Sequence, residues 1–287
     1  MKRLILITLI PLCVWALACG GAVEEQTAPA DADVLHVSLI ANEGYLLTSG
    51  DDKVLIDALF REGVEGYGTL PFESREMVET AEPPFDTVDY VLATHIHADH
   101  FHPLAVCRYL SMNPLAEFIS TRQAYDQMAK NCDSSDASAM ASRVKIGIND
   151  DGTSTPISMD DFVVESIRLH HGETSSIDNY GFRIQIGGRT IVHLGDTQVS
   201  VDEMRAAGMG DKPVDIAFVP YWYLITDRWI PAITEVINPR VIVVMHLPPE
   251  GSPHLEAYQG WEPLVGTILH RFPNATVFKE PFETQSF

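Results

Sequence analysis

The stretch "ATHIHADHFHP", residues 93–103, places four histidines and one aspartate within eight consecutive positions. Alternate residues of an extended segment point to the same side, so His95 and His97 can bind one metal ion together. Asp99 and His100 are adjacent, so their side chains point in different directions and can bind a second ion beside the first. Nitrogen and oxygen ligands without a thiolate suit zinc, and also iron or manganese. The stretch therefore indicates a metal site rather than a polar loop that happens to be rich in histidine.

Strands and helices are expected around this stretch. Short apolar runs at residues 87–94, 216–220 and 241–245 are typical of strands buried on both faces. Alternating patterns predict further strands within residues 34–60, 160–172 and 180–196, the last with a hairpin turn at Gly187 and Gly188. Helical patterns lie at residues 73–81, 103–112, 120–130, 200–209, 229–237 and 261–272. Early strands followed by alternating helices predict two packed sheets with helices outside.

Four of the expected strands end at a side chain that can bind a metal ion. His95 follows the first apolar run, and His246 follows the run at residues 241–245. Asp196 ends one alternating segment, and another runs into the adjacent pair His170 and His171. Because α/β folds place their sites at the carboxyl ends of strands, we expect these side chains to meet at one edge.

The pattern HxHxDH, with the later histidine, the Gly-Asp pair and the final strand-end histidine, resembles the metallo-β-lactamase fold hydrolase superfamily. The resemblance extends over almost the whole chain after residue 32. It implies an α/β (α+β) fold, a four-layer αββα sandwich with a dinuclear metal site at one edge of the two sheets. The implied ligands are His95, His97 and His171 for the first ion, Asp99, His100 and His246 for the second, and Asp196 bridging both.

The choice between His170 and His171 rests on the residue that follows. In related sequences the ligand commonly precedes a small residue in a loop, and Gly172 follows His171. By alternation, His170 should point to the opposite face. We therefore expect His171 to be the ligand, with His170 as the alternative.

Other residues are candidates for roles beside the ligands. Asp57 is expected either to orient a ligand histidine through its second ring nitrogen or to be a turn residue. His102 is expected to line the pocket or support a ligand. Tyr221 and Trp222 follow a strand end and form either a substrate wall or a hydrophobic plug beneath a loop. We expect no role in the metal site for four other histidines, which are His36, His193, His254 and His270.

The first residues predict export. Lys2 and Arg3 precede an apolar run at residues 4–18, which is shorter than the roughly 20 residues of a membrane-spanning helix. We expect residues 1–18 to be a signal peptide and Cys19 to carry lipid, because "ALAC" before "GG" resembles a bacterial lipoprotein box. The protein would then be anchored to the cell envelope, at the periplasmic face of the outer membrane in a Gram-negative host.

Residues 19–32 are expected to form a flexible tether, and residues 33–287 one hydrolase domain. The chain has 19 basic and 40 acidic residues and a formal net charge of −21, which disfavours nucleic acid as a partner. Cys107 and Cys132 remain in the body of the protein. An oxidising compartment would allow a disulfide between them, and two buried free thiols are the alternative.

The resemblance also implies a reaction. Two divalent ions, with zinc expected and manganese or iron as alternatives, hold a bridging hydroxide that attacks an ester-like bond. Asp99 would both hold the second ion and accept the proton of the nucleophile. Asp196 argues against antibiotic-hydrolysing members, which generally lack this aspartate. The alternative is a non-catalytic, metal-stabilised binding lipoprotein, although no ligand position has been lost.

The substrate expected is a small molecule or a lipid-like molecule. Residues 180–197, "YGFRIQIGGRTIVHLGDT", resemble the L-ascorbate-6-phosphate lactonase-like and N-acyl-phosphatidylethanolamine phospholipase-like branches of the superfamily. A lactone or a phosphodiester is therefore the expected substrate class, and membrane attachment through Cys19 would place the enzyme near lipids.

Overall fold

The computed structural model describes residues 34–287, except residues 150–151, 153, 155, 160–161 and 173–174. The predicted signal peptide, the predicted lipid attachment at Cys19 and the tether lie outside the described residues. Within the described part of the chain, no helix combines the length and the apolar character needed to cross a bilayer.

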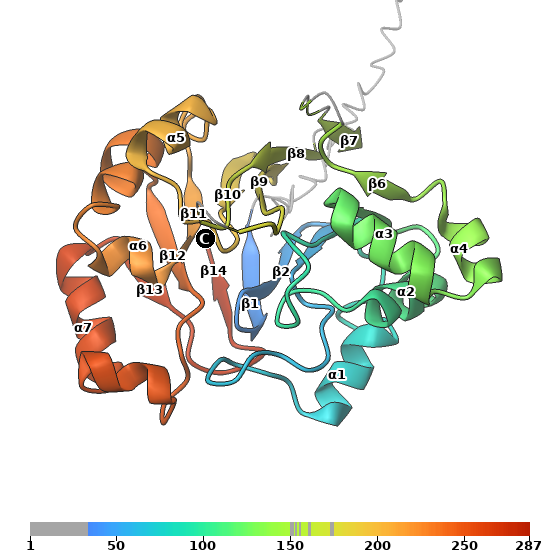
Figure 1. Ribbon diagram of the computed structural model, residues 1–287, viewed down its shortest axis with the longest axis horizontal. Helices are drawn as coiled ribbons and strands as arrows, with labels where there is room; N and C mark the ends of the chain where they lie inside the picture. Colours follow the sequence, from blue (N-terminus) through green and yellow to red (C-terminus); the bar gives the residue numbers. More distant parts are fainter. Residues whose placement is uncertain (1–33, 150–151, 153, 155, 160–161, 173–174) are drawn as a thin grey trace, which may run out of the picture. The chain divides into compact units, whose positions relative to one another are not determined.

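The first sheet has seven strands in the order β14-β1-β2-β3-β4-β5-β6 (Figure 1). Strands β1, β2 and β3 form the antiparallel set predicted from residues 34–60. Strands β3 to β6 are parallel to one another. The strands are β1 His36–Ala41, β2 Gly44–Ser49, β3 Asp52–Ile56, β4 Tyr90–Leu92, β5 Glu117–Ser120, β6 Val144–Ile146 and β14 Thr284–Ser286.

The second sheet also has seven strands, in the order β13-β12-β11-β10-β9-β8-β7. The predicted hairpin turn joins β9 to β10, and Gly187 and Gly188 have φ values of 55° and 68°, which suit glycine in a two-residue turn. The strands are β7 Ile157–Met159, β8 Phe162–Arg168, β9 Tyr180–Ile186, β10 Arg189–His193, β11 Ile216–Pro220, β12 Val241–Met245 and β13 Ala275–Val277.

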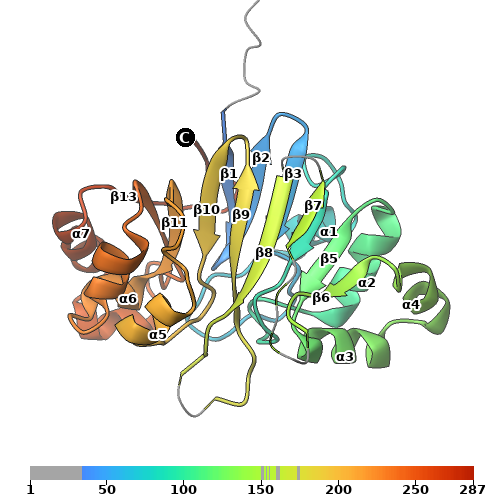
Figure 2. The ribbon, with the colours of Figure 1, turned by 90° about the horizontal axis from the view of Figure 1, so that it is seen from above.

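Helices cover the outer face of each sheet (Figure 2). Those beside the first sheet are α1 Phe72–Glu79, α2 Pro103–Met112, α3 Arg122–Asn131 and α4 Ser134–Met140. Those beside the second sheet are α5 Val201–Ala206, α6 Tyr221–Ile225, the π-helix Ala232–Ile237, the 3₁₀-helix Pro253–Tyr258 and α7 Trp261–Arg271. The layers are therefore helix, sheet, sheet, helix, and the predicted αββα sandwich is confirmed.

The larger apolar core fills the space between the two sheets. Tyr45 of β2 and Phe218 of β11 meet there with ring centroids 4.7 Å apart, and both are almost completely buried. A second core lies between the first sheet and its helices, where Phe118 packs with Phe101. Burial of this apolar surface stabilises the sandwich.

The sandwich departs from the sequence prediction mainly at its helix boundaries. The helix expected at residues 120–130 begins at Arg122, because Ser120 ends β5 and the Thr121 side chain accepts a hydrogen bond from the amide of Ala124. The segment expected to be helical at residues 229–237 is a π-helix over Ala232–Ile237. Short elements such as α4 and β6 carry too few residues to show a periodic pattern.

A disulfide joins Cys107 of α2 to Cys132, the residue that follows α3, with the two Cα atoms 6.1 Å apart. The sequence left open whether these cysteines are paired or free, and the structure pairs them. The bond fixes α2, which begins directly after the histidine-rich stretch, to α3.

Strand direction brings the four predicted strand ends together. β10, β11 and β12 are parallel, and β8 and β10 run the same way because each is antiparallel to β9. Their carboxyl ends, with that of β4, lead into the segments that carry the candidate ligands. The candidate ligands therefore meet at one edge of the sheets, as expected from the sequence.

Candidate metal centre

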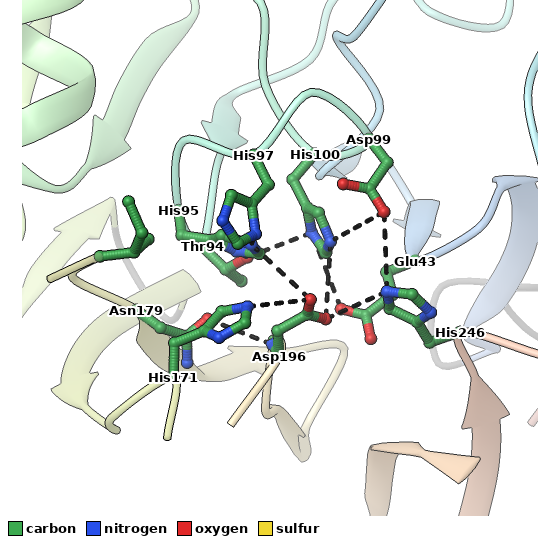
Figure 3. Close-up of polar contacts among 12 residues, drawn as sticks. Glu43, Thr94, His95, His97, Asp99, His100, His171, Asn179, Asp196 and His246 are labelled. Carbon is green, nitrogen blue, oxygen red and sulfur yellow. Dashed lines mark hydrogen bonds and ion pairs between the residues drawn. The ribbon is translucent and has the colours of Figure 1, made fainter. Parts of the chain in front are cut away.

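Seven side chains from these segments converge at one edge of the sandwich (Figure 3). The bend after β4 supplies four of them, and one comes from each of the segments that follow β8, β10 and β12. They are His95, His97, Asp99, His100, His171, Asp196 and His246, the full set implied by the family resemblance.

The first group comprises His95, His97, His171 and Asp196. His95 Nε2 lies 2.9 Å from His97 Nδ1 and 3.7 Å from Asp196 Oδ2. His171 Nε2 lies 3.2 Å from the same Asp196 oxygen. Three imidazole nitrogens and one carboxylate oxygen thus surround a single position.

The second group comprises Asp99, His100 and His246, and Asp196 joins it through its other oxygen, Oδ1. His100 Nε2 lies 3.7 Å from Asp99 Oδ2 and 3.5 Å from Asp196 Oδ1. His246 Nε2 lies 3.6 Å and 3.4 Å from these two oxygens. Asp196 therefore presents one carboxylate oxygen to each group.

These spacings fit a metal ion. Tetrahedral bonds of 2.0–2.2 Å to nitrogen and oxygen correspond to ligand-to-ligand distances of about 3.3–3.6 Å, close to the spacings of the second group. His100 Nε2 and Asp196 Oδ1 are buried and have no hydrogen-bond partner among the described residues. Buried polar atoms normally have a partner, so these two orphaned atoms fit a site whose partner is a cation.

The electrostatics of the groups also suit a cation. Burial lowers the pKa of His95 well below its usual value, so its imidazole is neutral. Burial would raise the pKa of Asp196, but the imidazoles of His246 and His100 hold it well below its usual range. A neutral His95 imidazole beside an ionised Asp196 carboxylate is the protonation state that metal binding requires of this pair.

Hydrogen bonds behind the ligands fix their orientation. Asp57 Oδ2 lies 2.9 Å from His100 Nδ1, and it also accepts the Thr94 hydroxyl at 2.7 Å. The Thr94 hydroxyl lies 3.0 Å from His95 Nδ1, so it can accept that ring N–H while donating to Asp57. Both imidazoles then turn Nε2 towards the metal position. The role expected for Asp57, orienting a ligand histidine, agrees with this placement.

Backbone conformation at the site is unusual. Asn42, Asp57 and His246 have φ values of 52°, 45° and 56°, a region that non-glycine residues seldom adopt. Gly195, which precedes Asp196, has φ of 55°, and a Cβ there would lie 2.5 Å from Asn179 Oδ1. That oxygen accepts the Asp196 amide at 3.2 Å, so glycine allows the close approach that positions the bridging carboxylate. Such conformations concentrate at functional sites.

Two site residues, Asn42 and Glu43, escaped prediction from the sequence. They form the turn between β1 and β2, where polar residues are ordinarily exposed to solvent. Here the Asn42 side chain donates to Asp99 Oδ2 at 3.0 Å, and Glu43 is completely buried 3.8 Å from His100 Nδ1. Nothing in the local pattern distinguishes this turn from a surface hairpin, because its burial is created by the facing sheet.

The two adjacent histidines, His170 and His171, have different surroundings in the structure. His171 belongs to the first group, whereas His170 is exposed and engages its neighbours through its backbone oxygen, which accepts from Gln198 and Thr197. His171 therefore occupies the position predicted for the ligand.

The remaining predicted residues lie around the centre. His102 belongs to none of the ligand groups found among the described residues and lies 3.8 Å from Glu62. Trp222 packs against His246 with ring centroids 5.1 Å apart, and its ring N–H donates to the Thr197 carbonyl. Tyr221 is largely buried beside Trp222. Trp222 therefore borders the second group and Tyr221 lies beside Trp222, and whether they form a substrate wall or a hydrophobic plug stays a prediction.

Of the four histidines expected to be ordinary, His193 has the most notable place. It is fully buried behind the centre, where its Nε2 lies 3.2 Å from the Glu43 carbonyl oxygen. His254 lies 3.1 Å from the carbonyl oxygen of Glu65. Neither His36 nor His270 belongs to a ligand group among the described residues.

Comparison with known proteins places this geometry in a family. Residues 52–261 match the family described as the beta-lactamase superfamily domain. A UPF0173 metal-dependent hydrolase of Pyrococcus furiosus is 26% identical over 245 residues, covering 80% of this chain and 88% of that protein.

Solved structures share the fold. Igni18, a metallo hydrolase of Ignicoccus hospitalis, superposes with a TM-score of 0.57 at 18% identity, covering 88% of this chain and 98% of its own. YhfI, a metallo-beta-lactamase fold protein of Bacillus subtilis, gives 0.58 at 16% identity, covering 89% and 100%. Together, the family match and the fold show that the chain belongs to the β-lactamase superfamily.

Proposed function

We propose that the protein is an exported metal-dependent hydrolase that uses two divalent ions to cleave an ester-like bond, either in a lactone or in a phosphodiester. The observation that carries this proposal is the pair of donor groups that share Asp196, one oxygen on each side. The naming of UPF0173 relatives as metal-dependent hydrolases supports it. Zinc is the expected metal because the donors are imidazoles and carboxylates in near-tetrahedral spacing.

Two ions bound in these groups would supply a hydroxide nucleophile at neutral pH and Lewis acids for the scissile group. The chain itself supplies the proton acceptor, Asp99. Its Oδ2 faces the second group, and the hydrogen bond from Asn42 holds the carboxylate in place. Asp99 would accept the proton of the attacking water and later return it to the leaving oxygen.

Two observations limit the substrate class, namely the types of ligand in the metal centre and the net charge of the chain. The seven ligands include no thiolate, so the donor set suits hydrolysis at a hard Lewis acid. A chain with a formal net charge of −21 repels polyanions, which argues against nucleic acid as the phosphodiester. A small lactone or a small or lipid-like phosphodiester is the proposed substrate.

Export and lipid attachment through Cys19 are part of the proposal. The disulfide between Cys107 and Cys132 supports export, because such bonds persist in oxidising compartments and are rare in the cytosol. The signal peptide and the lipid attachment site rest on the sequence pattern of the first 19 residues.

The test is a screen of the metal-loaded protein against chromogenic phosphodiesters, lactones, thioesters and a cephalosporin. Turnover of a phosphodiester or a lactone is the expected result. Asp99→Asn should lose a factor of about 10² to 10⁴ in kcat, since it loses the proton acceptor and weakens the second metal site. Asp202→Asn, at an exposed carboxylate on α5, is the matched control and should keep full activity.

Two outcomes would contradict the proposal. Rapid cephalosporin cleavage without ester turnover would place the enzyme among the antibiotic-hydrolysing members, against the argument from Asp196. No turnover of any substrate by protein that holds both metals would favour a non-catalytic binding protein.

A further inference from the structure

Tyr67 lies against the second donor group, although no sequence motif marks it. Its ring meets the His246 imidazole edge-on, with centroids 4.1 Å apart, and it stacks on the His254 ring at 5.0 Å. Trp222 packs on His246 at 5.1 Å. The His246 ring therefore contacts two aromatic side chains from separate segments, and Tyr67 is the one that ends in a hydroxyl group.

The segment that carries Tyr67 is held in place by its backbone. The amide of Gly63 donates to the Ala98 carbonyl at 3.2 Å, which ties the segment to the histidine-rich stretch. The Gly66 carbonyl accepts the Ser252 hydroxyl at 2.7 Å, which ties it to the segment after His246. Tyr67 is thus fixed between the two segments that supply the second metal site.

The hydroxyl of Tyr67 is partly buried and faces polar groups. It interacts with the Tyr221 hydroxyl, and the charges of Asp196 and Asp99 act on it. At neutral pH the group is a phenol and therefore a hydrogen-bond donor.

Tyr67 is also accessible to a small molecule. It is only partly buried, and it lines a cavity of about 540 Å³ together with Asn42, although the seven candidate ligands are not among the residues that line this cavity. The contact with His246 places Tyr67 beside a substrate that occupies the second metal site. A donor in this position acts most strongly where negative charge develops during the reaction.

We propose that Tyr67 is a catalytic residue that donates a hydrogen bond to the leaving oxygen of the substrate at the second metal site. This inference rests on the proposed ester hydrolysis. The oxygen of water forms a bond to the carbonyl carbon or phosphorus, and one water proton passes to Asp99. The bond to the leaving oxygen breaks with its electron pair on that oxygen. The leaving oxygen then takes the proton from Asp99, while Tyr67 keeps its own.

The assignment predicts which substrates need Tyr67. An alkoxide or an unsubstituted phenolate is a poor leaving group and gains much from a hydrogen bond. A 4-nitrophenolate is stabilised by its own ring and gains little. The dependence on Tyr67 should therefore increase as the leaving group becomes more basic.

The experiment compares Tyr67→Phe with the unmodified metal-loaded enzyme on matched pairs of substrates. The pairs are ethyl butyrate with 4-nitrophenyl butyrate, and methyl phenyl phosphate with methyl 4-nitrophenyl phosphate. Within the pair that the enzyme hydrolyses, kcat/KM should fall by about 10²-fold or more for the poorer leaving group. For the 4-nitrophenyl substrate the loss should be about tenfold or less. The phenylalanine ring keeps the packing on His246, so metal content by elemental analysis should not change.

Tyr125→Phe is the matched control, because it removes the hydroxyl of a partly buried tyrosine on α3, beside Arg122. It should leave both rates unchanged. Equal losses on both substrates, no loss on either, or loss of metal from Tyr67→Phe would each overturn the assignment while leaving the hydrolase proposal intact. Failure of the unmodified enzyme to hydrolyse either pair, together with no turnover of the lactones in the screen above, would instead overturn ester hydrolysis, and the role of Tyr67 with it.

Discussion

The His100 imidazole donates its Nδ1 hydrogen to Asp57, 2.9 Å away, at the carboxyl end of β3. The other Asp57 oxygen accepts the Thr94 amide at 2.7 Å, so the carboxylate is fixed from two sides. Because a carboxylate only accepts, His100 Nδ1 carries a hydrogen, and Nε2 is the nitrogen that can bind a metal ion once its own proton has been lost. The residue that follows β3 thus fixes which nitrogen His100, in the bend after β4, presents to the second metal site.

Asp57→Asn should weaken metal binding at the second site. The amide can no longer hold the imidazole through a charged hydrogen bond, and such supporting partners typically contribute about 10- to 100-fold in metal affinity. Competition with a chelator measures the change, with Asp202→Asn as the control. Unchanged affinity would show that Asp57 serves only the turn in which it lies.

The adjacent histidines should behave differently when removed. His171→Ala deletes a donor of the first group, so that site should lose its ion and the enzyme its activity. His170→Ala removes an exposed ring outside the group and should leave most metal in place. Elemental analysis of both variants decides the matter, and the reverse result would reassign the ligand.

Metal binding should release protons near neutral pH. Burial lowers the pKa of His100, but the carboxylates of Asp196 and Asp57 outweigh it and raise the pKa well above its usual value. The pKa of His171 is also raised, since the interaction with Asp196 outweighs burial. In the metal-free protein both imidazoles therefore keep their second ring proton to a higher pH than an ordinary histidine, and they must lose it to bind a cation.

Calorimetric titration with zinc in buffers of different ionisation enthalpy measures this release, which we expect to be detectable at pH 7. The number of protons released should fall at alkaline pH, where both imidazoles are already neutral. Heats that do not depend on the buffer would contradict the prediction. His171→Ala should release fewer protons than the unmodified chain.

Lipid attachment can be tested at Cys19. Cys19→Ser should release the protein from the membrane fraction or block its processing, because the serine hydroxyl cannot take the thioether link. Fractionation and mass spectrometry of the mature N-terminus provide the measurement. Unmodified protein that is free of lipid and absent from the membrane fraction would leave only the signal peptide prediction standing.

The interior between the sheets should be sensitive to loss of volume. Phe218 is completely buried against Tyr45, so Phe218→Ala should lower the free energy of unfolding by about 3–5 kcal/mol. Urea denaturation at constant metal concentration measures this change. Phe72→Ala, at a largely exposed aromatic residue that begins α1, should change the stability little.

The sequence is sufficient to predict what depends on short stretches of chain. The HxHxDH pattern and the strand ends at Asp196 and His246 are local features, and the αββα layers follow from the alternation of strands and helices. Glu43 and Tyr67 could not be found in this way. Their placement depends on the facing sheet and on neighbouring segments, and their own surroundings in the sequence are those of an ordinary turn and an ordinary loop.

Strand β1 separates the start of the described chain from the metal centre. At one end, Leu35 exchanges backbone hydrogen bonds with Phe287 at the other terminus of the domain. At the other end, the turn after β1 places Asn42 beside Asp99. The six residues His36–Ala41 span about 20 Å between these points. The start of the described chain and the metal centre therefore lie at opposite ends of one strand, so a label or a binding partner placed near Leu35 would leave access to the centre open.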